Sequence, residues 1–392
     1  MSPVSSGRVM TFFRSRWVDP PPGVQELDAA ELAPGFRAGG VACGLRGDGA
    51  TDLALLACDA DHVASAMVLT SNAAAGAPVR VCRERCDLTS LAGAVVNSGN
   101  ANAATGEVGY HDALAMRDAA AAALDLEPQR VAIAQTGVIG FPLDLDAVRN
   151  GITAAAGRLS PRGAGELADA ILTTDRGRKA CTVRADGVTI SAQAKGAGMM
   201  QPNFATLLCF VQTDGRVDDP QAELRPGVAD SFERITVDGQ QSTNDAVLLQ
   251  ASGAAERPLP AGLLDAVLLQ LALDVVADGE GASRIARVEA REAADEAEAE
   301  AVARAIANSP LVKASLYGRD PNWGRIAQAT GMALAGEDLG ELGGDAIDAS
   351  GLGSGEPEAD IVIRLGRGDA SAQVYFSDLT PDYVKLNSEY TT

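Results

Sequence analysis

Apolar and polar positions along the chain predict a mixture of short buried strands and helices. Apolar runs at 52–58, 93–96 and 131–134 are too short for helices, and unbroken short runs are typical of strands buried on both faces. Residues 112–126 are rich in alanine and have helical spacing. Strands and helices do not follow a steady β-α-β rhythm, so we expect a layered α+β (mixed α/β) architecture and not a doubly wound sheet.

Two turn sequences predict β-hairpins. The strands expected over 181–185 and 188–193 flank Asp186-Gly187, and both turn residues tolerate a positive φ. A second pair of apolar segments, 361–365 and 370–376, flanks a Gly-Arg-Gly-Asp turn. We therefore expect each pair to lie side by side as antiparallel strands.

The second half of the chain predicts a central strand, two helices and a long loop. Residues 206–211 follow a glycine-containing loop at 195–198 and are apolar enough for a strand buried on both faces. Helical spacing at 262–276 and 293–306 predicts two helices, the second with an acidic exposed face. The segment 336–358 is rich in glycine and acidic residues, and we expect a loop there.

Residues 1–25 are expected to form a poorly ordered extension. Arg8, Arg14 and Arg16 interrupt its apolar residues, so it lacks the apolar core of a signal peptide. The run Pro20–Pro22 is typical of a spacer. No apolar run in the chain reaches the roughly 18 residues that cross a bilayer, so we expect no membrane partner.

Charge and cysteine usage narrow the partners and the compartment. The formal net charge is −21, and a strongly acidic protein repels phosphate backbones, so we expect no nucleic-acid partner. Hydrophobic residues make up 46 % and charged residues 22 % of the chain, an ordinary balance for a soluble protein. The six cysteines show no CxxC spacing, which indicates free thiols in a reducing cytoplasm.

The histidine content limits the possible chemistry. His62 and His111 are the only histidines, and neither stands in a motif, so a Ser-His-Asp triad and a multi-histidine metal site are not expected. Cys82 and Cys86 lack the second pair of ligands that zinc needs. No GxGxxG motif with an acidic residue behind it follows an expected strand. We expect neither a metal nor a cofactor, and an enzyme here needs another kind of base.

Thr206 offers such a base. Cleavage of the peptide bond between Ala205 and Thr206 would leave an α-amine beside the threonine hydroxyl. An α-amine has a pKa of about 8, so it can accept the hydroxyl proton near neutral pH. Gly196 and Gly198 make the preceding loop flexible, and Ala205 is small enough for the hydroxyl to approach its carbonyl. By itself, the pattern is more typical of an ordinary strand start than of a nucleophile.

The segment around this threonine, KGAGMMQPNFATLL at 195–208, resembles the self-cleavage segment of the ornithine acetyltransferase (bifunctional glutamate N-acetyltransferase) family. Further blocks match the same family in the same order: NSGNANA (97–103), TGVIG (136–140), TTD (173–175), TVDG (236–239), STND (242–245), DGEGA (278–282), NSPLVK (308–313), DPNWGR (320–325) and NSEYTT (387–392). The match runs from about residue 34 to the end. Ordered blocks of this length are more specific than one short motif.

The resemblance implies a fold and an activity. The fold would be a layered αββα sandwich, shared with related aminopeptidases, with a smaller C-terminal α/β part. Self-cleavage would give an α chain over 26–205 and a β chain over 206–392, assembled as a heterotetramer with two copies of each. The enzyme would act in the cytoplasm, in the cyclic route of arginine biosynthesis. It would move acetyl from N-acetylornithine to glutamate by a ping-pong reaction through an acetyl-Thr206 ester.

The resemblance also implies roles for residues. Thr136 and Gly137 match the oxyanion-hole positions, where a hydroxyl and a backbone N–H stabilise the tetrahedral intermediate. An ammonium such as that of Lys195 suits a substrate carboxylate, and a carboxylate such as that of Glu280 suits a substrate amine. The substrate-binding positions of the family are matched by Thr173, Lys195, Thr206, Glu280, Asn387 and Thr392.

Alternatives stay open at this point. The sequence Arg-Gly-Arg-Lys after Asp175 and the short stretch 335–360 depart from the family, which would fit a paralogue that uses another acyl group or amine in a specialised pathway. A related self-processing aminopeptidase or amidohydrolase would resolve the ester with water, and an uncleaved homologue would only bind a ligand. The sequence also leaves open whether acetyl-CoA serves as a donor.

Overall fold

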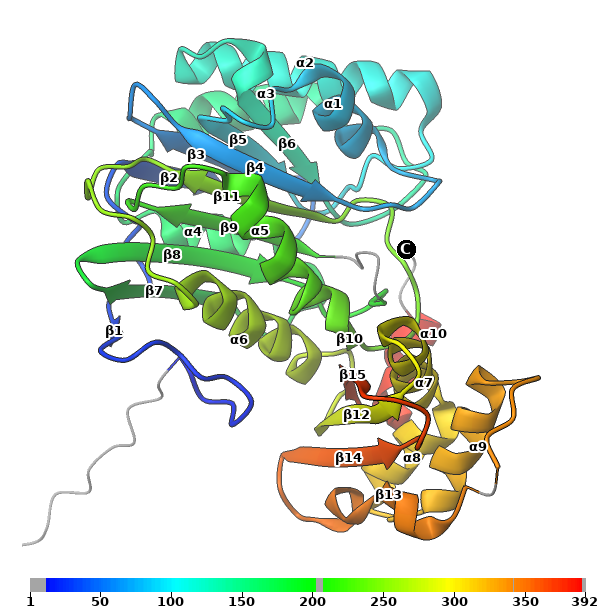
Figure 1. Cartoon of the computed structure of the whole chain (residues 1–392). Coiled ribbons are helices and arrows are strands. Elements are labelled where there is room, and N and C mark those ends of the chain that lie inside the picture. Colours follow the sequence, from blue (N-terminus) through cyan, green and yellow to red (C-terminus); the bar gives the residue numbers. More distant parts are fainter. Residues whose placement is uncertain (1–11, 202–206, 341, 390–392) are drawn as a thin grey trace, which may run out of the picture.

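The computed structural model describes residues 12–201, 207–340 and 342–389, which form three β-sheets with helices around them (Figure 1). The six-stranded sheet has the order β1 (Gln25–Glu26), β7 (Lys179–Ala185), β8 (Val188–Lys195), β9 (Leu208–Thr213), β11 (Ala246–Ala251) and β4 (Ala64–Leu69). The four-stranded sheet has the order β2 (Phe36–Val41), β3 (Leu53–Cys58), β5 (Gly93–Asn97) and β6 (Val131–Gln135). The five-stranded sheet has the order β10 (Ile235–Thr236), β15 (Ala370–Ser377), β12 (Ile285–Ala293), β14 (Glu358–Arg364) and β13 (Ile347–Asp348).

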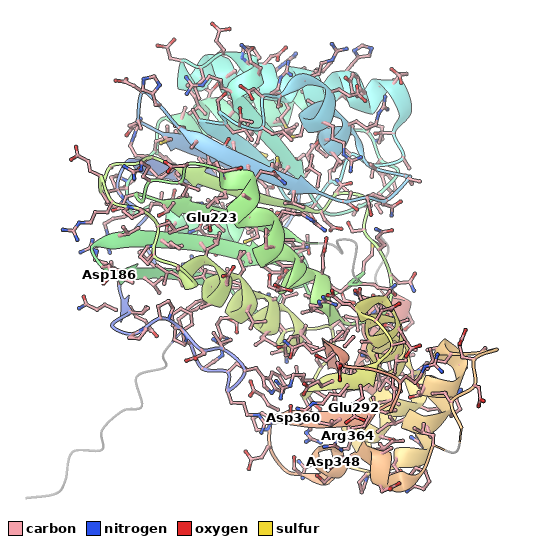
Figure 2. The ribbon with its side chains drawn as sticks, viewed as in Figure 1. Asp186, Glu223, Glu292, Asp348, Asp360 and Arg364 are labelled. Carbon is pink, nitrogen blue, oxygen red and sulfur yellow. The ribbon has the colours of Figure 1, made fainter. Side chains whose placement is uncertain are left out.

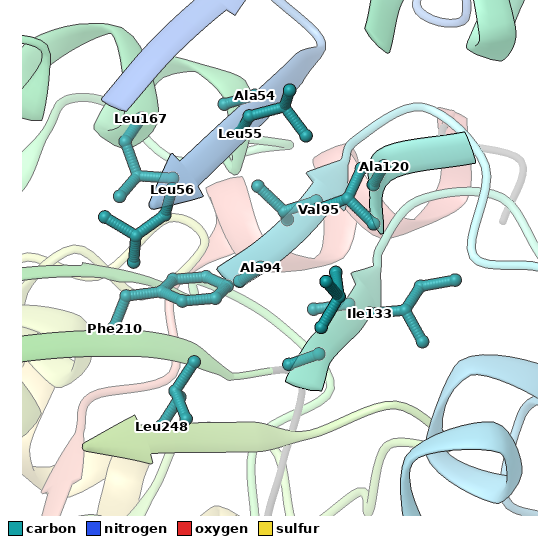
Figure 3. Close-up of a cluster of buried hydrophobic side chains, with 14 of the residues drawn as sticks. Ala54, Leu55, Leu56, Ala94, Val95, Ala120, Ile133, Leu167, Phe210 and Leu248 are labelled. Atoms are coloured by element: carbon teal, nitrogen blue, oxygen red, sulfur yellow. The ribbon is translucent and has the colours of Figure 1, made fainter. Parts of the chain in front are cut away.

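The first two sheets pack face to face, because the faces that meet are apolar. In β9, Phe210 points into the core shared with the four-stranded sheet, and Cys209 and Val211 belong to the core on the opposite face. Figure 3 shows Phe210 and Leu248 of the larger sheet beside side chains of the smaller one. β9 (Leu208–Thr213) is buried on both faces, and this confirms the central strand expected at 206–211 for residues 208–211.

Helices cover the two outer faces of this sandwich. Three helices pack on the four-stranded sheet: α1 (Ala77–Arg85), α2 (Gly106–Leu124) and α3 (Leu145–Ala156). Two helices, α5 (Pro220–Ala229) and α6 (Leu263–Ala277), pack on the six-stranded sheet. The short helix α4 (Ala164–Ala170) contacts strands of both sheets, including β2, β3 and β8. The layers confirm the α+β class and the αββα sandwich. Among the described residues, no helix combines the length and apolar character needed to cross a membrane.

The first predicted hairpin is confirmed. β7 and β8 pair antiparallel, with Ala185 opposite Val188. The two turn residues both have a positive φ, 49° at Asp186 and 80° at Gly187. Asp186 marks the tip of this turn in Figure 2. The turn chemistry therefore set the pairing here, as the sequence predicts.

The second predicted hairpin is wrong. β14 and β15 do not pair with each other, because β12 lies between them, parallel to β14 and antiparallel to β15. The connection crosses the end of β12, where the N–H of Leu365 donates to the carbonyl of Arg291 (3.0 Å) and that of Arg367 to Glu292 (2.7 Å). Glu292 and Arg364 are labelled in this region in Figure 2.

The five-stranded sheet and three helices form a smaller α/β part with its own core. The helix expected at 293–306 is α7 (Glu296–Asn308). It begins three residues later than expected, because residue 293 still belongs to β12 and Asp295 caps the helix by accepting the N–H of Glu298 (2.8 Å). Across 336–358, where the sequence predicts a loop, the described residues form short 3₁₀ turns and the two-residue strand β13, and residue 358 begins β14. The other two helices are α8 (Pro310–Gly318) and α9 (Trp323–Ala333).

Residues 12–24 lie against the rest of the protein, so the expectation of a poorly ordered extension over 1–25 does not hold for this part. Trp17 packs on Tyr375 with ring centroids 5.3 Å apart. Its indole N–H donates to Asp360 of β14 (3.1 Å), which Figure 2 labels beside this segment. Such contacts supply the free energy that offsets the loss of chain entropy. The first eleven residues lie outside the described part of the chain.

Candidate active site

A pocket of about 210 Å³ lies where strands of both sandwich sheets end. We call it the site pocket, and it is lined by these residues that the resemblance singled out: Thr136, Gly137, Thr173, Lys195, Glu280 and Asn387. They come from segments far apart in the sequence, and the fold brings them together. Ala205, Thr206 and Thr392 lie outside the described residues.

Thr136 and Gly137 directly follow β6, in a turn that requires glycine. Gly137 has a φ of 126°, and a Cβ there would lie 2.4 Å from the carbonyl carbon of Gly99. The N–H of Thr136 donates to the carbonyl of Asn97 (3.0 Å), which ties the turn to the end of β5. The backbone conformation of this turn is therefore set by its close approach to the loop after β5.

Lys195 is the last residue of β8 and is only 1 % exposed. Its Nζ donates to Oγ1 of Thr136 (3.4 Å), which leaves the hydroxyl proton of Thr136 available for another acceptor. Burial lowers the pKa of Lys195, and the charge of Asp175 opposes that effect. The site pocket therefore has its positive end beside the Thr136-Gly137 turn.

Asp175 joins two segments of the site. Its carboxylate accepts hydrogen bonds from the N–H groups of Thr173 (3.1 Å) and Gly196 (2.8 Å) and from Nζ of Lys179 (2.6 Å). Burial alone would raise the pKa of Asp175, but the charges of Lys195 and Lys179 outweigh it and lower the pKa to about 2. Asp175 stands in the matched block TTD, but no role for it was predicted from the sequence.

Glu280 gives the site pocket a negative side. The hydroxyl of Thr174 donates to Oε1 of Glu280 (2.7 Å), and Nδ2 of Asn387 donates to Oε2 (2.8 Å). The N–H of Glu280 donates to the carbonyl of Ala197 (2.8 Å), and a Cβ on Gly198 would lie 2.6 Å from the carboxylate carbon. The carboxylate is therefore packed against the loop after β8 and bound at both oxygens. Thr174 is not among the residues predicted from the sequence.

Two further carboxylates, half-buried Asp238 and buried Asp245, bind the backbone on either side of the expected cleavage segment. Asp238 accepts hydrogen bonds from the N–H groups of Met199 (2.6 Å) and Met200 (2.7 Å). Asp245 is fully buried and accepts the N–H of Leu207 (2.8 Å), and burial raises its pKa to about 8. Both stand in matched blocks, but no spacing in the sequence relates them to the residues they bind.

A larger cavity, of about 460 Å³, lies under the N-terminal segment. Its charged groups already have partners, because Arg14 pairs with Asp274 (2.7 Å) and Lys179 with Asp278 (2.5 Å). None of the described residues with a predicted role lines it. The smaller site pocket, which contains both a positive end and a negative side, is the candidate active site.

Comparison with known proteins gives consistent matches over most of the chain. The model of the ArgJ family matches residues 37–392. An arginine biosynthesis bifunctional protein ArgJ from Symbiobacterium thermophilum is 42 % identical, in an alignment that covers 91 % of this chain and 97 % of that protein. A protein of the same name from Geobacter sulfurreducens is 40 % identical, over 91 % of this chain and 99 % of that protein.

Solved structures were compared as well. The structure of an ornithine acetyltransferase from Mycobacterium tuberculosis, complexed with ornithine, is 35 % identical and aligns with a TM-score of 0.44. The alignment covers 46 % of this chain and 98 % of that chain.

Proposed function

The chain belongs to the ArgJ family, and from that premise we propose that it transfers an acetyl group from N-acetylornithine to glutamate in arginine biosynthesis. The observation that carries the proposal is the site pocket. It combines a buried ammonium on Lys195, a carboxylate on Glu280 and the Thr136-Gly137 turn. A substrate with a carboxylate, an amine and an amide carbonyl needs such a set of groups.

The nucleophile in this proposal is Thr206, freed by cleavage of the Ala205–Thr206 bond. Its hydroxyl attacks the acetyl carbonyl carbon while its α-amine takes the hydroxyl proton. The Thr136 hydroxyl and the Gly137 N–H donate to the oxyanion that forms. The intermediate collapses as the proton passes to the α-nitrogen of the leaving ornithine, and an acetyl-threonine ester remains. Glutamate then attacks the ester through its amine by the same steps in reverse.

The buried geometry supports the assignment of the oxyanion hole. Lys195 donates to the oxygen of the Thr136 hydroxyl, which makes that hydroxyl a stronger donor to a third atom. In the same proposal Lys195 attracts the substrate carboxylate, Glu280 and Asn387 face the side-chain amine, and Thr173 and Thr392 complete the binding groups. We also propose the cytoplasm as the compartment and the heterotetramer as the assembly.

Intact-mass measurement and an acetyl-transfer assay test this proposal together. We expect two fragments, the smaller beginning Thr206-Leu207, and acetylglutamate formation that requires both N-acetylornithine and the enzyme. Thr206→Ala should abolish cleavage and transfer, and Thr153→Ala, an exposed control on α3, should change neither.

Acetate release that does not depend on glutamate would point to a hydrolase. A single chain without activity would contradict the proposal, and acetyl-CoA in place of N-acetylornithine tests the second donor.

A further inference from the structure

Thr174 contacts Glu280 but has no role among the residues matched to the family. It lines the site pocket, and its hydroxyl donates to Oε1 of Glu280 at 2.7 Å. A hydrogen bond to a carboxylate is stronger than one between neutral groups. The direction of the Glu280 carboxylate therefore depends in part on this one hydroxyl.

The turn that carries Thr174 is fixed to the loop against which Glu280 packs. Both are bound by the same buried carboxylate, since Asp175 accepts the N–H of Thr173 on the turn and the N–H of Gly196 at the start of the loop. Glu280 in turn bonds to the carbonyl of Ala197 in that loop. The distance between the Thr174 hydroxyl and the backbone of Glu280 is thus determined by a continuous set of hydrogen bonds.

Two donors hold the carboxylate of Glu280 from opposite sides. Thr174 binds Oε1 and Asn387 binds Oε2, so rotation of the carboxylate would break both hydrogen bonds. A carboxylate can accept about four hydrogen bonds, so each oxygen keeps capacity for a ligand. Asn387 lies on the exposed helix α10 (Pro381–Glu389), whereas Thr174 lies on the anchored turn. Thr174 is the more firmly placed of the two donors.

We propose that Thr174 is a positioning residue that orients Glu280 toward a cationic side chain and so favours the donor amino acid. The inference rests on the proposed function. In that reaction both substrates place an α-nitrogen at the acetyl group, but N-acetylornithine carries an ammonium at the end of its side chain and glutamate a carboxylate. An oriented Glu280 attracts the first and repels the second.

The isosteric pair Thr174→Val and Thr174→Ser tests this inference. Valine keeps the shape of the threonine but cannot donate, so we expect the KM for N-acetylornithine to rise about tenfold, the loss of one hydrogen bond to a charged group. The KM for glutamate should stay the same or fall, and kcat should stay within about threefold. Serine restores the donor, and its KM for N-acetylornithine should lie within about twofold of the wild type.

A double-substitution cycle separates action through Glu280 from a general effect on the fold. In a Glu280→Gln background, Thr174→Val should add less than about twofold to the donor KM, because the charge that it orients is already gone. Thermal unfolding of each variant should stay close to that of its parent.

Three results would overturn the inference: an unchanged donor KM in Thr174→Val, equal increases for donor and acceptor, or an additive effect with Glu280→Gln. Wild-type enzyme without acetyl transfer would instead overturn the proposed function on which the inference rests.

Discussion

Asp175 carries a full charge although its side chain is buried, so the site depends on the few groups that compensate this charge. Its neighbours Lys179 and Lys195 are also buried, so each charge is stable only in the presence of the others. Thr173, Gly196 and Lys179 donate to the same carboxylate. One side chain therefore holds two segments of the active site at a fixed distance.

We expect Asp175→Asn to lower the free energy of unfolding by about 3 kcal/mol at pH 7, because it leaves buried cations with less compensation. The folded-state pKa of Asp175, about 2, lies below its ordinary value of 3.8. Its ionisation therefore stabilises the fold above pH 3.8, and this contribution is lost as the pH falls toward 2. Urea unfolding at several pH values should show the difference from wild type shrinking below about pH 4. A difference that stays constant would contradict this prediction.

Gly137→Ala should lower kcat for acetyl transfer by about 10²–10³, the effect of losing one oxyanion donor. The φ of 126° and the 2.4 Å approach to Gly99 leave no room for a Cβ, so the turn would have to move. Gly140→Ala is the matched control, because Gly140 also has a positive φ (86°) but a Cβ there would meet nothing within 4 Å. Comparable losses in both variants would assign the effect to backbone strain in general.

At the scale of elements, the site is built at the ends of strands and from one exposed helix. β6 and β8 end at the site pocket, and α10 near the C-terminus carries Asn387 to it. Thr380 attaches this helix, since its hydroxyl donates to the carbonyl of Gly281 (2.7 Å) and accepts the N–H of Tyr383 (3.2 Å). The cap of α10 is therefore also its connection to the segment next to Glu280.

Thr380→Val should lower the stability of helix α10 by about 1 kcal/mol, the usual effect of losing an N-cap. We expect faster amide exchange across 382–389 and a higher KM for N-acetylornithine, because Asn387 would reach Glu280 less often. Ser388→Ala serves as a control near the other end of the helix, where the hydroxyl donates to the carbonyl of Lys385. Unchanged exchange in Thr380→Val would show that other contacts dock the helix.

At the scale of the whole molecule, the N-terminal segment connects the sandwich to the C-terminal part. Arg14 pairs with Asp274 on α6 (2.7 Å), and Arg16 pairs with Asp360 on β14 (2.7 Å). Trp17 packs on Tyr375 of β15, and its indole N–H donates to Asp360 of β14. The segment that leads into β1 of the sandwich therefore also binds the C-terminal part, which is distant from it in the sequence.

Trp17→Ala should lower the free energy of unfolding by about 2 kcal/mol, less than the loss for a fully buried tryptophan because Trp17 is half-buried. Trp323 on α9, which is 48 % exposed, is the matched control, and its replacement by alanine should cost less than about 1 kcal/mol. Urea unfolding measures both. Equal effects would mean that the N-terminal segment adds little to the stability of the fold.

Local features of the fold could be predicted where the chain carries its own conformational preference. The turn at Asp186-Gly187 tolerates a positive φ, so the hairpin of β7 and β8 followed from two residues. Gly-Arg-Gly-Asp before β15 looks equally suitable, but β12 takes the place between the strands. Pairing with a strand about 70 residues earlier depends on the three-dimensional core, which no turn sequence encodes.

The sequence by itself determined the layered class, several strands and two helices of the sandwich, the family and six of the residues that line the site pocket, because hydrophobic periodicity and long matched blocks are properties of the chain. Only the tertiary structure decided that residues 12–24 are bound, that β12 separates β14 from β15, and that Thr174, Asp175 and Asp245 support the site. Burial and hydrogen-bond partners arise between segments far apart in the sequence. They exist only once the chain has folded.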